Sequence, residues 1–167
     1  APILVKCNIA MLSNEHFASL KHTLLGKKPH QQVCLVFQEQ AIAKAHNKTI
    51  EHLTELKQQG ILIGIEDFGH FRCDLNIITR LAFDFIILSA IFSQRILQQP
   101  AQQLQLQGLL TVAKLTNSQV VATGPAILNY QQLLERHGLT LYAAPATAEQ
   151  QQHSAAVHSA SLHLLSR

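Results

Sequence analysis

The chain has 167 residues, of which 47% are hydrophobic and 14% charged, so it is long and apolar enough to fold as one globular domain. This composition excludes an intrinsically disordered chain. The formal net charge is only +3 and no dense lysine or arginine cluster is present, so direct nucleic-acid binding is not expected. The three cysteines lack metal-site spacing, which favours a reduced, cytoplasmic setting. No stretch has the length of a transmembrane helix, so any membrane attachment is expected only through regions outside this sequence.

Apolar runs typical of strands alternate with segments of helical periodicity along the chain. In the first half, strands are expected over residues 3–9, 33–37 and 61–65. Helices are expected over residues 14–25 and over a segment that begins at Asn47 or Thr49, either of which would be a suitable N-cap. Gly60 supplies the C-terminal stop of that second helix.

The second half continues the same alternation. Helices are expected over residues 75–80, 101–115 and 130–137, and strands over 83–88, 119–122 and 139–143. The tail, residues 146–167, has a weak apolar pattern and is expected to be helical or mobile. The domain itself is therefore expected to cover residues 1–145.

Repeated strand–helix units of this size predict an α/β fold with about six mainly parallel strands and outer helices. Two architectures satisfy this pattern, an open doubly wound sheet and a (β/α) barrel, and periodicity alone does not separate them. In either architecture the functional side chains lie at the carboxyl ends of the strands.

Glu66 and Asp67 form the only adjacent acidic pair at such a strand end. Two oxygen ligands there suit a magnesium or manganese ion, and paired metal ions suit phosphodiester hydrolysis. Consecutive strand residues point to opposite faces, however, unless the backbone bulges. A structural role, in which these acids cap the following turn or pair with Arg72 or Arg80, explains them equally well.

The residues that follow give weaker signals. His70, Cys73 and Asp74 match no closed zinc pattern. A Cys73–His70 nucleophile pair lacks an orienting third group. The single glycine of Thr123-Gly124-Pro125 is too little to indicate a phosphate-binding loop.

Six segments carry a resemblance to a known family. They resemble segments of the EAL domain, the bacterial cyclic di-GMP phosphodiesterase: LVKCNIA at residues 4–10, CLVFQEQA at 34–41, IGIEDFG at 63–69, FDFIILSAIF at 83–92, VVATGPA at 120–126 and LYAAP at 141–145, where the family has a Gln-Gly pair followed by contacts to the dinucleotide. The resemblance runs from Ile3 to about Pro145 and lacks roughly the first third of that domain. It implies an incomplete EAL-type (β/α) barrel, and the abrupt opening of the sequence suggests a fragment of a longer chain.

The resemblance also assigns roles to individual positions. Asn8, Glu66 and Asp67 match metal-binding positions and are interpreted as remnants, and Glu39 matches a supporting acid. Other positions depart from the family pattern: Val36 replaces a metal-binding glutamate, Ile87 the catalytic lysine, Ser89 a metal-coordinating aspartate, Thr123 a metal ligand and Ala126 a catalytic-loop glutamate. The resemblance therefore implies a degenerate domain with no catalytic residue, no metal site and no cofactor, and its ligand-binding residues stay unknown.

A degenerate EAL domain is expected to be a regulatory module of a bacterial signalling protein that acts through protein–protein interaction. One resembling type, CsrD, is an RNA-turnover adaptor whose EAL-like domain recognises a sugar-phosphotransferase protein, and the flagellar anti-activator type is another. The expected partner is such a protein, another domain of the same protein or a second copy in a homodimer, since exposed sheet edges need covering. The alternatives are a cyclic di-GMP sensor without hydrolysis and, less favoured, a residual phosphodiesterase that uses Glu66, Asp67 and His70.

Overall fold

The computed structural model describes residues 2–26, 32–70, 74–123 and 141–143, together with Gln132, Glu135 and Arg136. Its strands are β1 (Ile3–Lys6), β2 (Val33–Gln38), β3 (Leu62–Phe68), β4 (Phe85–Leu88), β5 (Gln119–Thr123) and β6 (Leu141–Ala143). Its helices are the 3-10 turn Ile9–Leu12, α1 (Asn14–Gly26), α2 (Glu39–Ala43), α3 (Asn47–Gln58), α4 (Leu75–Arg80), α5 (Ala90–Gln98) and α6 (Pro100–Leu115).

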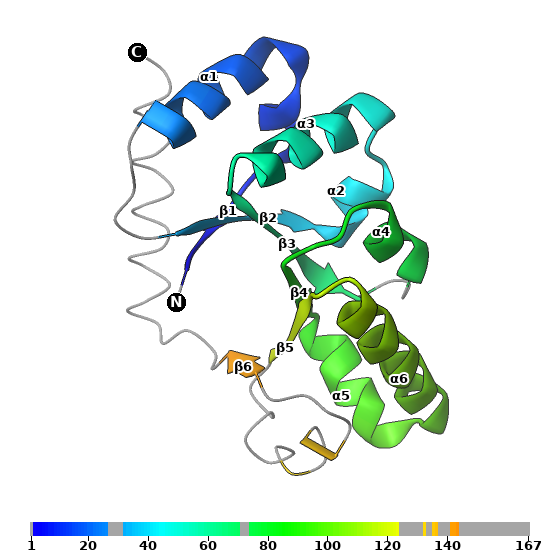
Figure 1. Cartoon of the computed structure of the whole chain (residues 1–167). Helices are drawn as coiled ribbons and strands as arrows, with labels where there is room; N and C mark the ends of the chain where they lie inside the picture. Colours follow the sequence, from blue (N-terminus) through cyan, green and yellow to red (C-terminus); the bar gives the residue numbers. More distant parts are fainter. Residues whose placement is uncertain are drawn as a thin grey trace.

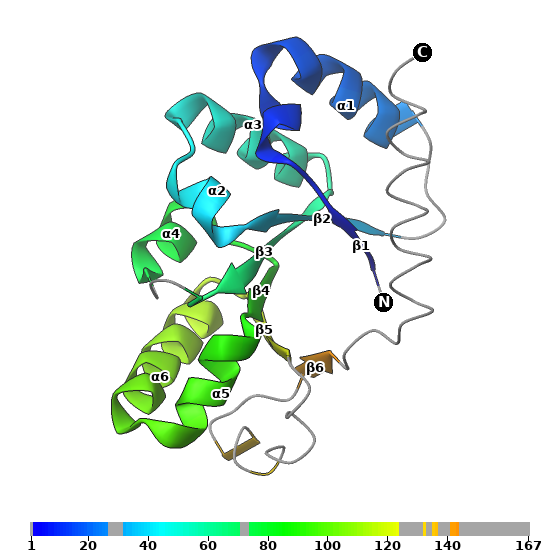
Figure 2. The ribbon, with the colours of Figure 1, turned by 180° about the vertical axis from the view of Figure 1, so that it is seen from behind.

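The strand order decides between the two predicted architectures. The six strands lie side by side in chain order, β1 to β6, and every neighbouring pair is parallel. A doubly wound sheet reverses its strand order at a switch point, whereas a (β/α) barrel does not. Figures 1 and 2 show the sheet as a curved, open arc with α1, α3, α4, α5 and α6 on its outer side. The fold is thus an incomplete (β/α) barrel, as predicted.

Most predicted elements are confirmed, and α4 has the predicted bounds. Four details were wrong. The short helix α2 was not predicted. The first strand ends at Lys6, because Asn8 caps the 3-10 turn that follows. The N-cap of α3 is His46, so Asn47 is already helical. Helix α5 was missed, because its first residues are apolar and continue the pattern of the strand before it. The predicted tail and most of the predicted helix 130–137 lie outside the described residues.

The side chains on the two faces of the sheet pack differently. On the outer face, alternate strand residues such as Phe37, Ile65 and Leu88 are fully buried in one core with the helices. On the inner face, a Cβ added to Gly64 would lie 3.3 Å from both Cys34 Sγ and Val36 Cγ2. Small or slender residues are therefore needed where the inner sides of β2 and β3 meet.

Asp84, which directly precedes β4, forms hydrogen bonds with residues of three other elements. Its Oδ2 accepts hydrogen bonds from the backbone N–H of Ile63, at 2.8 Å, and from the ammonium of Lys57 on α3, at 2.7 Å. The Asp84 backbone N–H donates to the Ile63 carbonyl, and its own carbonyl accepts from the N–H of Gln119 at the start of β5. The side chain and backbone of this one residue thus connect α3, β3 and β5 to the start of β4.

Asp84→Ala is expected to lower the free energy of unfolding by about 2–4 kcal/mol, because the Ile63 N–H loses its acceptor and the Lys57 ammonium loses its carboxylate partner and keeps only the Ala82 carbonyl. Urea denaturation measures this change. Glu51→Ala, which removes an exposed ion pair with Lys48 on α3, is the matched control. It should change the free energy of unfolding by no more than about 0.5 kcal/mol. Equal effects of the two substitutions would contradict the role assigned to Asp84.

Candidate functional site

The carboxyl ends of β1, β2 and β3 bring polar side chains together on the inner face of the sheet. The strand register pairs Lys6 with Val36, Val36 with Gly64, and Gln38 with Glu66. Residues paired across parallel strands point to the same face, and so do residues two apart along a strand. We call these side chains and those at the ends of β4 and β5 the inner mouth, defined as Lys6, Gln38, Glu66, Asp67, Ile87 and Thr123.

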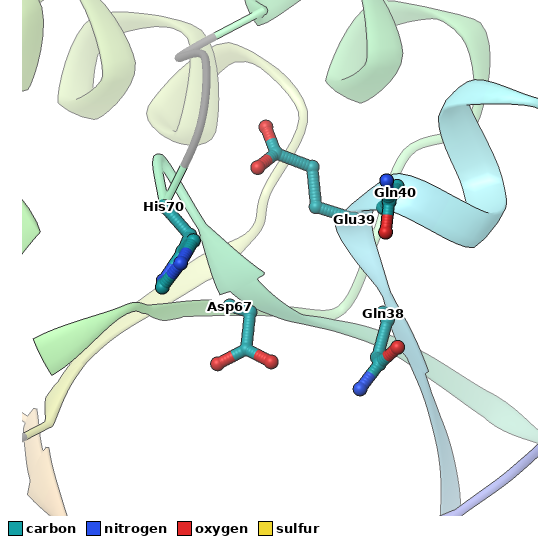
Figure 3. Close-up of a pocket in the computed structure, with 5 residues that line it drawn as sticks. All are labelled: Gln38, Glu39, Gln40, Asp67 and His70. Carbon is teal, nitrogen blue, oxygen red and sulfur yellow. The ribbon is translucent and has the colours of Figure 1, made fainter. Parts of the chain in front are cut away.

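A backbone bulge brings Glu66 and Asp67 to the same side. The pairing of β3 with β4 shifts register between Ile65 and Phe68, and Asp67 has a φ of 57°. In Figure 3 the side chains of Asp67 and Gln38 point the same way, and Gln38 is the register partner of Glu66. The bulge thus overrides the alternation that would place two adjacent acids on opposite faces. Left-handed backbone is uncommon for a residue with a side chain, although aspartate tolerates it better than most.

Glu66 forms an ion pair that the sequence did not predict. Its Oε2 lies 2.8 Å from Nζ of Lys6, which reaches across β2 from β1. Of the two arginines expected as partners, Arg80 instead donates to Asn47, and Arg72 lies outside the described residues. Lys6 was not predicted as a site residue. Residues two apart along a strand share a face, so the alternation of β1 would have placed Lys6 on the same face as the predicted position Asn8.

A tight turn follows the two acids. The N–H of His70 donates to the Asp67 carbonyl at 3.1 Å, and Gly69 has a φ of +78°. A Cβ at Gly69 would lie 2.7 Å from the ring of Phe92 on α5. Only glycine suits both the backbone conformation and the contact.

Glu39 supports this turn from the start of α2. Its side chain is buried, and Oε2 accepts a hydrogen bond from the Gly69 N–H at 3.1 Å. Oε1 has no hydrogen-bond partner among the described residues. Burial raises the pKa of Glu39 to about 7, an effect that the Gly69 amide opposes and the nearby charges of Asp74 and Asp67 increase.

A pocket of about 280 Å³ lies between the ends of β2 and β3. It is lined by Gln38, Glu39, Gln40, Asp67 and His70. Figure 3 shows Glu39 extending away from the direction taken by Asp67 and Gln38. The pocket thus offers a mixture of carboxylate and carboxamide groups whose two carboxylates do not converge on one point.

The polar residues at the ends of β4 and β5 bond to the backbone. Ser89 is the N-cap of α5, and its Oγ accepts a hydrogen bond from the Phe92 N–H at 3.0 Å. Thr123 Oγ1 donates to the Leu88 carbonyl at 2.6 Å. Ile87, near the end of β4, has a half-buried aliphatic side chain on the inner face. These three positions therefore supply no charged side chain, and the two hydroxyl groups are bonded to backbone groups.

The remaining predicted positions are placed as follows. Asn8 is exposed, and its Oδ1 accepts from the Ala10 N–H at 2.9 Å. Asp74 caps α4 through the Asn76 N–H. Val36 is buried and pairs with Lys6 across β1 and β2. Cys73, Gly124, Pro125 and Ala126 lie outside the described residues. Within the part of the chain that the structure describes, no group of three or more His, Cys, Asp or Glu side chains is arranged to hold a metal ion.

A parallel sheet in chain order, with outer helices and acids at its carboxyl ends, defines a (β/α)-barrel protein of the type that carries its site at that edge. A profile of the EAL domain family matches residues 1–142. The chain belongs to the EAL domain family, which is associated with cyclic di-GMP signalling.

Solved EAL structures show the same fold. The EAL domain of Mycobacterium smegmatis DcpA is 21% identical, with a TM-score of 0.68; the match covers 84% of this chain and 64% of that one. Klebsiella pneumoniae BlrP1 in a calcium and cyclic di-GMP complex is 22% identical, with a TM-score of 0.72, over 84% of this chain and 36% of that one. An EAL domain protein from Listeria monocytogenes EGD-e is 14% identical, with a TM-score of 0.72, over 86% and 57%.

The chain thus spans 64% or less of the length of these three proteins. A search of the curated proteins found no match. Among the helices of the described residues, none combines the length and apolarity needed to cross a bilayer.

The pKa of Glu39 predicts a pH-dependent stability. Because this pKa is about 7 in the fold and 4.5 ordinarily, the folded state binds more protons than the unfolded state between these values. The free energy of unfolding should therefore fall by roughly 3 kcal/mol as pH rises through this window, and level off above it. Glu39→Gln, which stays neutral, should flatten the fall in urea titrations at several pH values.

Glu15→Gln, at an exposed acid of α1, is the control for this measurement and should leave the slope unchanged. A wild-type stability that does not fall across this window would show that Glu39 is ionised in the fold at its ordinary pKa.

Proposed function

We propose that this chain is a non-catalytic EAL domain that works as a regulatory module of a bacterial signalling protein by binding another protein. The observation that carries the proposal is the carboxyl end of β4. There the position that matches the family's catalytic lysine holds Ile87, whose side chain neither transfers a proton nor carries a charge. Two residues on, Ser89 stands where the family has a metal-coordinating aspartate.

The neighbouring strand ends support the same proposal. Val36 and Thr123 stand at two further family ligand positions, and the Thr123 hydroxyl donates to a backbone carbonyl. Hydrolysis of a phosphodiester with two divalent ions needs several carboxylates around the ions. The described inner mouth offers Glu66 and Asp67, and Glu66 is paired with Lys6.

The partner that we propose is a protein rather than a nucleic acid. No basic cluster of the kind that binds nucleic acid occurs in the sequence. The resemblance to CsrD-type domains makes a component of the sugar-phosphotransferase system the first partner to test. Such a test could instead find that the partner is another domain of the same protein or a second copy of this chain.

A second candidate is a cyclic di-GMP sensor that binds without hydrolysis. It is favoured by the similarity of the fold to that of BlrP1, which was solved as a complex with calcium and cyclic di-GMP. We rank it below protein binding, because in the family's contact segment this chain has Leu141-Tyr142-Ala143-Ala144-Pro145 in place of the family's Gln-Gly pair.

Incubation with cyclic di-GMP and Mg²⁺ or Mn²⁺, followed by chromatography, tests the loss of catalysis. We expect no linear product above a protein-free control, with an active EAL phosphodiesterase run in parallel. Product formation that disappears in Asp67→Ala would contradict the proposal and support the residual phosphodiesterase. Micromolar binding by calorimetry without product would instead support the sensor.

Calorimetric titration with purified phosphocarrier components of the sugar-phosphotransferase system tests the partner. We expect saturable binding to one component, unchanged by cyclic di-GMP. Affinity purification from a bacterial lysate, with an active EAL domain as the matched bait, extends the search if none binds. Failure to recover any reproducible partner by both routes would count against a protein-binding role.

A further inference from the structure

An ion pair spans the inner face of the first three strands. Lys6 lies on β1 beside Val36 of β2, and Glu66 lies on β3 beside Gln38 of β2, so the pair crosses β2 diagonally. Nζ of Lys6 is 2.8 Å from Oε2 of Glu66, although the Lys6 side chain is 70% exposed and that of Glu66 only 12%. The lysine thus extends over the sheet to reach a carboxylate that is nearly withdrawn from water.

A buried carboxylate needs a positive charge or several hydrogen-bond donors beside it, because its charge is costly to remove from water. In a metal-dependent site, the metal ion supplies that charge. Here a side chain of the chain itself supplies it. The two cations compete for Glu66, because their mutual repulsion disfavours an ammonium and a divalent ion beside the same carboxylate.

We propose that the Lys6 ammonium is a built-in cation that takes the place of a divalent metal ion at Glu66, so that the inner mouth keeps its charge balance without metal. Two other side-chain oxygen atoms near these strand ends are already hydrogen-bonded within the chain, which supports this proposal. Asn8 Oδ1 is engaged by the Ala10 N–H, and the Thr123 hydroxyl donates to the Leu88 carbonyl.

The donor set does not fit a divalent ion. Magnesium and manganese take about six oxygen ligands, and a protein site supplies several of them from converging carboxylates. The carboxylates of the described inner mouth are those of Asp67 and the already paired Glu66, and no group of three or more His, Cys, Asp or Glu side chains among the described residues could hold a metal ion. This proposal concerns the chain alone and holds whether or not a partner protein binds.

A Mn²⁺ titration of the ¹⁵N-labelled chain tests it, because the paramagnetic ion broadens the amide signals of nearby residues. For the wild type we expect no selective broadening at Gly64, Glu66 or Asp67 at submillimolar Mn²⁺. In Lys6→Met, which removes the charge and keeps most of the length of the side chain, these amides should broaden at Mn²⁺ concentrations that leave the wild type unchanged. Adding Glu66→Gln to Lys6→Met should abolish the gain.

Two substitutions control the measurement. Lys48→Met removes a lysine from an exposed pair with Glu51 and should leave the broadening pattern at β3 unchanged. Lys6→Arg keeps the charge and should behave as the wild type. Equal Mn²⁺ responses of Lys6→Met and the wild type would overturn the proposal.

If Lys6→Met does not fold, the wild type is compared with Glu66→Gln alone in the same Mn²⁺ titration. The proposal predicts that the β3 amide signals of the two proteins broaden equally. Selective broadening of the wild type that Glu66→Gln removes would show a metal ion at Glu66 and would overturn the proposal.

Discussion

The parallel register from β1 to β6 is the constraint on which the rest of the structure depends. Because every strand runs the same way and neighbours the next in sequence, all carboxyl ends meet at one edge of the sheet. The same register places Lys6, Val36 and Gly64 in one row and Gln38 and Glu66 in the next. The lysine on β1 therefore reaches the acid on β3 diagonally across β2.

Much of the framework follows from sequence because it is local and repetitive. Strand-length apolar runs, and the stop at Gly60 with its φ of +86°, are properties of short segments. The bounds of α4 and the family-like segment from Phe83 to Phe92 could likewise be predicted from a few adjacent residues. The strand order, by contrast, is a tertiary property, and periodicity alone left two architectures open.

The inner mouth was harder to predict, because its key features depend on contacts far apart in sequence. The bulge at Asp67 reverses the facing that alternation predicts for adjacent acids. The Lys6–Glu66 pair joins residues from different strands, and only the register of three strands brings them together. Glu39 was recognisable as an acid near a strand end, but its burial and its bond to Gly69 depend on the turn after β3.

The residues at the carboxyl end of β4 have structural roles of their own. Serine is a good N-cap, and Ser89 caps α5 without carrying a charge. Ile87 is β-branched, which suits a strand, and its side chain is half-buried on the inner face. The fold of an EAL domain is thus compatible with the non-catalytic role that we propose, because a fold does not by itself carry an activity.

Anomalous diffraction from a crystal of this chain grown with Mn²⁺ tests the central claim most directly, since it locates both the ion and the side chains. The account predicts no anomalous peak at the inner mouth and Lys6 Nζ within hydrogen-bonding distance of Glu66. A manganese peak bound by Glu66 and Asp67, with Lys6 displaced into solvent, would contradict it.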